Sequence, residues 1–458
     1  MPFVILPTNS ASGGYDVTNS LRFNSGSSDY LNRTFGSPTN NKIFTFSFWI
    51  KRGDLAREQF FFNGASASQF YINNEDKLYY YDQTAGGTYK TTQVFRDVSA
   101  WYHIVVAEDT TQATAGDRVK IYVNGTQVTA FDIQTNPTQN NSSAWNANAT
   151  AYYIGRYNPS PSGYYWNGYF SETYFIDGQQ LTPSSFGETD FDTGIWKPKA
   201  YTGTYGTNGF YLQFKNSSSL GTDSSGNGNT FTVNNLTSVD QTTDTPTNNF
   251  ATANPLDYSG IAPTLGNGNL SITTAELSDK PFRTTIAVSK GKWYMEYKCE
   301  KSGSDNDNHF GLWSAENSLT SNYVGYQLYS WGIFTSDGNK RNNQSSTSYG
   351  SAIAQNDIVM IALDKDNGKI WWGKNGTWFN SGNPASGTNE AFSNINTVVG
   401  ADGFVSFCFL PQQRFSLNFG NPPYSGGSYT DSAGFGNFSY SVPSGFYALC
   451  TKNLSTQG

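Results

Sequence analysis

The sequence predicts an all-β protein made of two β-sandwiches. Aromatic residues make up 16% of the 458 residues and charged residues only 14%, and the chain holds 46 glycines and 17 prolines. This balance favours strands and turns over helices. Two stretches, 118–131 and 356–379, are typical of β-hairpins because Asn-Gly turns separate short apolar runs. They lie far apart along the chain, so we expect one sandwich around each.

The first domain, placed at 1–190, alternates apolar runs with turn residues. Phe44, Phe46 and Phe48 fall on one face of a strand that ends near Lys51. Further strands are expected at 20–23, 60–62, 70–72, 78–81, 101–107, 152–155 and 168–176. Residues 191–262 hold one convincing strand, at 209–214, among many turn residues. We interpret them as a turn-rich extension followed by a Thr/Asn/Pro-rich linker.

The second domain, placed at 263–424, is organised around the hairpin region 356–379. Its unbroken apolar run at 358–363 suits a strand covered on both faces. Asn375-Gly376 predicts a tight turn with positive φ, and Trp371 or Trp372 should be buried. Other strands are expected at 292–299, 309–313, 323–334, 404–410 and 415–419. Residues 425–458 form a Gly/Ser/Tyr-rich C-terminal segment.

Several motifs carry family resemblances. FTFSFWIKR, WYHIVVAEDTT, VKIYVNGTQV and WNGYFSETYFIDGQQL, in this order, resemble laminin-G-like domains. GKWYMEYK, NDIVMIALDKDNGKIWWGKNGTWF and FSLNFGNPPY resemble a SPRY domain, although Asn356 replaces the usual glycine before Asp357. Both families belong to the concanavalin-A-like superfamily. The resemblance implies two jelly-roll sandwiches that bind glycans or proteins through loops.

The combination of these two domains, with the phrases FVILPTNSASGGYDVTNSLRFN and TGIWKPKAYTGTYGTNGFYLQF, resembles tail-fibre and adhesion-type virion proteins of tailed phages. It implies a non-enzymatic structural protein in the virion, with other virion proteins and a host-surface glycan or protein as partners. A capsid decoration or head-fibre protein is the alternative. We expect a homo-oligomer built from sandwich faces or terminal segments, because the sequence has neither heptads nor shaft repeats.

Composition excludes several classes of protein. The net charge is −7 and no basic block is present, which argues against a nucleic-acid partner. The N-terminus lacks the basic region of a secretory signal, and no window is apolar enough to span a membrane. We therefore expect synthesis in a host cytoplasm. Three scattered cysteines are too few for a disulfide framework or a zinc site.

Catalytic residues are not predicted. The closest approach to the E-x-D-x-E motif of β-glucanases is 188–192, which ends in Asp192 and lies in turn-like sequence between Gly187 and Gly194. Only two histidines occur, and we expect His103, in the middle of a strand, to be a satisfied histidine. A glycan hydrolase is thus the least favoured function.

Calcium is the one cofactor considered. Asp223, Asn227 and Asn229 lie in a phrase that resembles the D-x-S-G-x-G-N motif of laminin-G-like domains, where it lies near a calcium site. Here the phrase follows the sandwich instead of opening it. A glycine-opened turn with an Asx hydrogen bond would explain the same residues without a metal. The run 305–308 is a second candidate.

For ligand binding, we single out Tyr164, Tyr165 and Trp166 in the turn-rich loop 159–167. Exposed rings matter because the apolar face of a sugar stacks on them. Residues 79–81 and 326–331 hold similar clusters, but strand alternation should turn about half of such rings inward.

Overall fold

The computed structural model describes residues 14–64, 67–158, 164–260, 262–272, 280–300 and 308–458. Across these residues β-strands and short helices are present, and strands dominate, so the predicted all-β fold is confirmed. The chain divides into two compact units, and the division falls between Thr247 and Asn248. Each unit is described by itself below.

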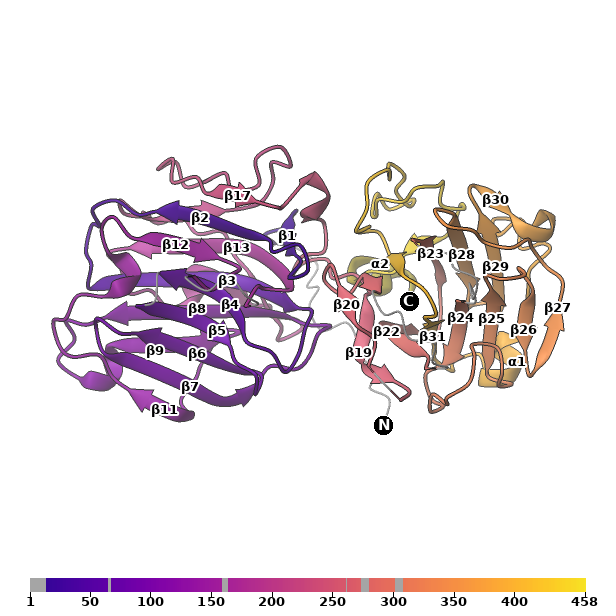
Figure 1. Cartoon of the computed structure of the whole chain (residues 1–458), viewed down its shortest axis with the longest axis horizontal. Coiled ribbons are helices and arrows are strands. Elements are labelled where there is room, and N and C mark those ends of the chain that lie inside the picture. The colour runs from indigo at the N-terminus through magenta and orange to yellow at the C-terminus, as the bar shows by residue number, and fades with distance from the viewer. Residues whose placement is uncertain (1–13, 65–66, 159–163, 261, 273–279, 301–307) are drawn as a thin grey trace. The chain divides into compact units, whose positions relative to one another are not determined.

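Two large antiparallel sheets build the first unit (Figure 1). Over the described residues, sheet A has the order β10 (Thr126–Gln127), β9 (Val119–Val123), β8 (Trp101–Asp109), β3 (Ile43–Arg52), β13 (Gly168–Asp177), β1 (Ser20–Phe23), β18 (Gln241–Thr242), with β16 (Phe210–Leu212) also on β13. Sheet B has the order β11 (Phe131–Thr135), β7 (Gly87–Val94), β6 (Lys77–Asp82), β5 (Ser68–Ile72), β4 (Gln59–Gly64), β12 (Ala151–Ile154), β2 (Tyr30–Thr34), β17 (Thr232–Asn234). Short 3-10 helices lie in the connections: η1 (Ala115–Asp117), η2 (Ala144–Asn146), η3 (Pro183–Ser185) and η4 (Ser238–Asp240).

The core of this unit lies between the two sheets. Phe44, Phe46 and Phe48 are buried on β3, as their alternation predicts. From sheet B, Phe62 and Phe70 meet them, with ring centroids 4.7 Å apart for Phe46–Phe62 and 5.6 Å for Phe48–Phe70. Burying one such side chain stabilises the fold by about 1.5–3 kcal/mol. This packing fixes which side chains of sheet B point outward.

Residues 191–247 differ from the predicted extension and linker, although β16 confirms the strand expected at 209–214. They supply β16, β17 and β18 to the two sheets, and the hairpin of β14 (Gly187–Thr189) and β15 (Trp196–Pro198) packs on the outer face of sheet A through Trp196. The Lys51 ammonium lies 2.8 Å from the Asp244 carboxylate, and both side chains are buried. Strands of two or three residues show no periodicity, which is why composition alone indicated a linker.

The second unit is again a pair of sheets. One has the order β19 (Ala253–Tyr258), β22 (Phe282–Val288), β31 (Val405–Leu410), β24 (His309–Ser314), β25 (Ser330–Phe334), β26 (Lys340–Asn342), β27 (Ser345–Thr347). The other has the order β20 (Leu265–Gly266), β21 (Ser271–Ile272), β32 (Phe415–Asn418), β23 (Lys292–Cys299), β28 (Ile358–Asp364), β29 (Lys369–Lys374), β30 (Thr377–Trp378), with β33 (Tyr447–Ala448) parallel to β23. Helical turns are η5 (Phe379–Ser381), α1 (Ile395–Val399) and α2 (Thr451–Gln457).

Strand β28 is covered on both faces, as its apolar run predicts. Ile361 faces the sandwich core, whereas Met360 faces a second cluster that contains Phe438 and Phe446. Those two rings come from residues 425–458, which we predicted as a separate segment. The structure shows instead that these residues complete the second unit and cover the outer face of its central strands.

The hairpin between β29 and β30 confirms the predicted turn. Asn375 and Gly376 have φ of 51° and 85°. The two preceding tryptophans are both buried, Trp372 in the sandwich core and Trp371 in the second cluster. Both faces of the strand therefore hold a tryptophan that is removed from water.

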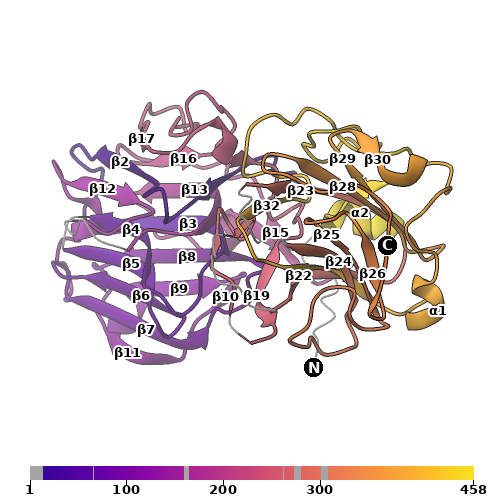
Figure 2. The same cartoon turned by 45° about the vertical axis from the view of Figure 1, so that its right-hand side comes forward.

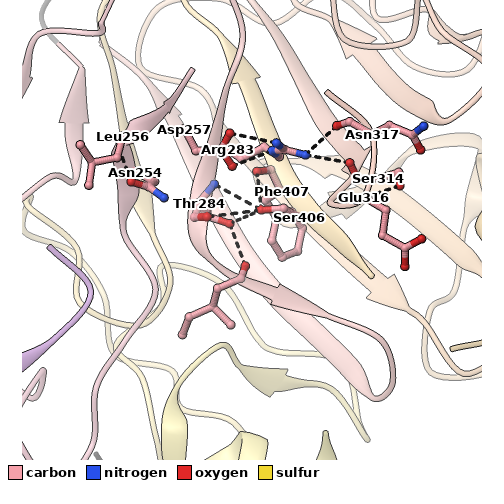
Figure 3. A network of polar contacts seen from close by, with 11 residues as sticks. Asn254, Leu256, Asp257, Arg283, Thr284, Ser314, Glu316, Asn317, Ser406 and Phe407 are labelled. Atoms are coloured by element: carbon pink, nitrogen blue, oxygen red, sulfur yellow. Dashed lines mark hydrogen bonds and ion pairs between the residues drawn. The ribbon is translucent and has the colours of Figure 1, made fainter. Parts of the chain in front are cut away.

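An arginine network holds the edge strand of the second unit in place (Figure 3). The Arg283 guanidinium donates to both carboxylate oxygens of Asp257, at 2.8 and 2.9 Å. It also donates to the backbone oxygens of Ser314 and Asn317. Residues 253–258, which we expected in the linker, are thus an integral strand of this unit.

Candidate binding face

The outer face of sheet B carries a continuous group of aromatic side chains. In both views β4 to β7 lie side by side in this sheet (Figures 1 and 2). Side chains alternate along each strand, so every second one points away from the core. Tyr80 points inward and is buried, whereas its neighbours Tyr79 and Tyr81 are half-buried on the outer side. The cluster predicted at 79–81 is therefore divided between core and surface.

Five rings on this face form what we call the aromatic row: Phe60, Tyr71, Tyr79, Tyr157 and Tyr164. Phe60 and Tyr71 stack at 4.5 Å between ring centroids with an interplanar angle of 11°, and Tyr79 lies 4.9 Å beyond Tyr71. On the other side of Phe60, Tyr157 lies at 4.8 Å and Tyr164 at 6.0 Å. Phe60 is only 3% exposed, whereas Tyr164 is 39% exposed at the end of the row. The row therefore presents ring faces and edges to a ligand, and the strands of sheet B hold these rings in place.

Burial also sets the chemistry of the phenols in the row. Desolvation raises the pKa of Tyr71 and Tyr79 above the ordinary value for tyrosine. Both hydroxyl groups therefore stay neutral at physiological pH and can donate and accept hydrogen bonds.

Next to the row lies a second group, which we call the arginine cage: Arg156, Tyr30, Tyr153 and Tyr165. The guanidinium carbon of Arg156 lies 4.6 Å from the ring centroid of Tyr30, 5.3 Å from that of Tyr153 and 5.6 Å from that of Tyr165. Cation–π attraction at such distances holds the guanidinium against the rings. The cage joins strands β2 and β12 to the loop that carries Tyr165.

The structure corrects one of the three predicted ligand residues. Tyr164 and Tyr165 lie on the outer face of sheet B, in the aromatic row and the arginine cage. Trp166 is 0% exposed and packs in the core, with ring centroids 5.0 Å from Phe61 and 5.6 Å from Phe170. It lies two residues before the start of strand β13, and its indole fills the sandwich and cannot stack on a ligand.

The residues that complete this face were not predicted from the sequence. Arg156 and Tyr157 follow the short strand β12, and Tyr30 begins β2. Their spacing is ordinary for a strand end, and only the pairing of β12 between β4 and β2 brings them together. Strict alternation applied to the tyrosines of β5 and β6 would have found two of the five rings of the row.

The residues predicted to bind calcium form a self-contained turn. The Asp223 carboxylate accepts the backbone N–H groups of Tyr211, Ser225 and Asn229, at 2.9, 2.9 and 2.7 Å. It also accepts the Ser225 hydroxyl at 2.8 Å. Both carboxylate oxygens are thereby used in the Asx-type arrangement that needs no ion.

The two asparagines of this turn do not supply a calcium site either. The side-chain nitrogen of Asn227 donates to the backbone oxygens of Gly206 and Gly209. The side-chain oxygen of Asn229 accepts a hydrogen bond from the Arg33 guanidinium, and this positive charge would repel a cation. These residues do not fit calcium. The second candidate run, 305–308, lies outside the described residues except for Asn308.

The acidic run at 188–192 carries no catalytic geometry. Glu188 lies in the short strand β14, where we expected a turn, and Lys197 of β15 binds both Glu188 and Asp190, at 3.7 and 2.9 Å. The lysine and Thr193 lower the pKa of Asp190 to about 2. A general acid in a glycosidase needs the opposite shift, towards a raised pKa.

His103 is a satisfied histidine in the interior. The Trp196 indole nitrogen, which can only donate, lies 2.9 Å from Nδ1 of His103. The proton of the neutral ring is therefore on Nε2, which lies 2.8 Å from the Ser47 hydroxyl. Burial lowers the pKa of His103 to about 3, so the ring is uncharged at neutral pH.

In the part of the chain that the structure describes, no group of three or more His, Cys, Asp or Glu side chains could hold a metal ion. No helix among those same residues is long and apolar enough to cross a membrane.

Comparison with protein families matches each unit to a family model. Residues 25–185 match the concanavalin A-like lectin/glucanases superfamily, and residues 292–422 match the SPRY domain. Together with the observed sheets, these matches confirm two sandwiches of concanavalin A-like fold in one chain. A comparison with curated proteins gives no significant match.

Three solved structures are also similar. The SPRY domain of human HERC1 is 17% identical, with 36% of this chain and 96% of that chain covered and a TM-score of 0.30. A "putative carbohydrate binding protein" from Bacteroides ovatus is 17% identical, with coverages of 50% and 60% and a TM-score of 0.36. A heptameric SAP-like pentraxin from Limulus polyphemus is 15% identical, with coverages of 37% and 80% and a TM-score of 0.28. At these TM-scores, the three structures carry no argument about a ligand.

Proposed function

We propose that this chain is a non-enzymatic recognition protein whose first unit binds a glycan on the outer face of sheet B. The observation that carries the proposal is the aromatic row, in which neighbouring rings share one face of a rigid sheet. The apolar face of a sugar stacks on such rings, and neutral phenols form hydrogen bonds with its hydroxyl groups. The concanavalin A-like fold of the domain is consistent with this role.

Two observations support a function without catalysis. Two carboxylates of the acidic run at 188–192, those of Glu188 and Asp190, pair with Lys197. His103 has both ring nitrogens engaged in the interior. Groups that are committed to partners within the protein are poorly suited to act as a general acid or base towards a bound sugar.

We further propose that the protein acts in the virion of a tailed phage, as a tail-fibre or receptor-binding component. The support is the succession of a laminin-G-like and a SPRY domain, with the phrases described above. In this role the chain is made in the host cytoplasm and assembles with other virion proteins as a homo-oligomer. Several copies binding at once would then give strong overall binding, even though each single site binds weakly. Binding to empty capsids without adsorption to host cells would favour the capsid decoration alternative.

The experiment compares single ring removals on a panel of envelope polysaccharides and defined oligosaccharides. Tyr71→Ala and Tyr164→Ala should each weaken glycan binding by about fivefold or more, because one lost ring contact is worth about 1 kcal/mol. Phe191→Ala is the matched control, since this ring is 99% exposed and lies outside the row. Calorimetry measures the affinity, and chromatography of the glycan tests for cleavage.

Three results would contradict the proposal. One is full binding by both tyrosine variants. Another is an equal loss of binding in the Phe191 control. Release of shorter oligosaccharides would overturn the assignment of a non-enzymatic function.

A further inference from the structure

We infer that the glycan bound on this face carries a carboxylate and that Arg156 is the residue that binds it. This inference rests on the proposed glycan function and adds the chemical class of the ligand. The inference is based on the arginine cage. The rings of the aromatic row can stack on a sugar without this cage, so the guanidinium must be explained separately.

The cage presents a guanidinium that is already oriented. Three rings lie within 5.6 Å of the Arg156 guanidinium carbon, so the plane of the group is held before a ligand arrives. Its hydrogen bonds inside the protein are long: Nε donates to the Tyr157 backbone oxygen at 3.4 Å and a terminal nitrogen donates to the Asn158 side-chain oxygen at 3.5 Å. Because these hydrogen bonds are long, the N–H groups of Arg156 remain available for stronger ones. A planar guanidinium can donate two parallel hydrogen bonds to the two oxygens of a carboxylate.

Charge pairing sets Arg156 apart from the lysines of the same sheet. Lys77 lies 2.7 Å from Asp132, and Lys90 lies 3.1 Å from Glu75. Each of these lysines also contacts the other's carboxylate partner, so both positive charges are neutralised. Among the described residues, no carboxylate forms an ion pair with Arg156. A half-buried cation without a counterion, in a protein of net charge −7, indicates a site for an external anion.

The cage and the row are close enough to share one ligand. Arg156 and Tyr157 are consecutive, as are Tyr164 and Tyr165, so each pair places one residue in the cage and one in the row. Consecutive Cα atoms lie about 3.8 Å apart, which is less than the length of one sugar unit. A sugar stacked near Tyr164 can therefore place a carboxylate of its own or of its neighbour at Arg156.

The test uses the full chain and pairs of acidic oligosaccharides with their carboxyl-reduced, neutral counterparts of the same linkage. An oligogalacturonate and its reduced form are one pair, and oligoglucuronates and sialylated glycans supply others. A sulfated neutral oligosaccharide shows whether any anion is sufficient. We expect at least one acidic probe to bind about tenfold more tightly than its reduced form, with a preference that weakens as salt increases.

Three variants assign this preference to the cage. Arg156→Gln should abolish the preference, so that the acidic probe and its reduced form bind this variant with similar affinity. Arg156→Lys should restore the preference only in part, because an ammonium lacks the planar fork. Lys90→Gln is the control, because it removes a paired charge from the same sheet and should leave the preference intact. Melting temperatures of all variants confirm that they fold.

The outcomes separate this inference from the proposed function. Neutral and acidic probes that bind equally, or a carboxylate preference that survives Arg156→Gln, would overturn the inference and leave glycan binding standing. A sulfated probe that binds as well as the carboxylate probe would overturn the carboxylate assignment. Failure of every probe to bind would count against both the glycan function and the inference.

Discussion

At the scale of single residues, burial decides which titratable groups matter for stability. His103 is buried and neutral, with a pKa of about 3 in the folded protein against about 6.5 in the unfolded chain. The unfolded chain therefore binds a proton first as the pH falls. The contribution of this neutral ring to stability is fully present above pH 6.5 and is lost as the pH falls towards 3.

We predict that His103→Gln makes the protein less sensitive to acid. Glutamine can accept from the Trp196 indole and donate to the Ser47 hydroxyl without taking up a proton. Between pH 7 and pH 4 the wild type should lose about 3 kcal/mol of unfolding free energy relative to the variant. Urea denaturation at a series of pH values measures this difference. An equal pH dependence of the two proteins would show that the ring is protonated in the folded state.

Whether a side chain points into the core or towards solvent was predictable within a strand pattern but not in a loop. His103, with only a strand pattern to place it, was correctly expected to be satisfied within the fold. Trp166 was misplaced because the loop composition around it indicated a surface, and only the packing against Phe61 and Phe170 shows where its indole lies. Arg156 was missed, since its role depends on rings from two other segments.

At the scale of elements, long strands and Asn-Gly hairpins were predictable, whereas some of the shortest strands were not. Strand β28 and the turn at Asn375-Gly376 carry strong local signals. In contrast, β17 and β18 have only three and two residues and depend on partners far away in the sequence. These strands form because they pair with the edges of existing sheets, and the local amino-acid composition does not show where those edges lie.

We predict that Gly376→Val destabilises the second unit by about 1–3 kcal/mol, because β-branched residues fit poorly at positive φ. A Cβ atom at this position would also lie 3.1 Å from the Tyr440 ring. Gly376→Asn is the matched control and should cost less, since asparagine tolerates the left-handed region. Thermal and urea unfolding of both variants provide the measurement. Equal stability of the valine variant and the wild type would contradict the turn geometry.

At the scale of the whole molecule, the existence of two sandwiches was predictable and their boundaries were not. The two families of motifs predict one domain each, and the structure has one unit for each. The boundary lies earlier than the second domain we placed at 263–424, since Asn248 begins the second unit. Phe250, in the Thr/Asn/Pro-rich stretch, is 2% exposed, and its backbone pairs with that of Cys450 in an isolated antiparallel β-bridge. The polar composition of this stretch therefore indicated a linker, although Phe250 within it is buried.

This boundary gives the last prediction: residues 248–458 should fold alone, whereas residues 263–458 should be markedly less stable. The shorter fragment lacks the edge strand β19, the buried ring of Phe250, and Asp257, the partner of the buried Arg283. Loss of that partner leaves a buried charge unpaired, which typically costs 3–5 kcal/mol, and the buried ring adds about 2 kcal/mol. Asp257→Ala in the longer fragment isolates the first of these contributions. Protease resistance and thermal unfolding compare the three proteins, and a fragment 263–458 as stable as 248–458 would show that β19 is dispensable and would restore the linker interpretation.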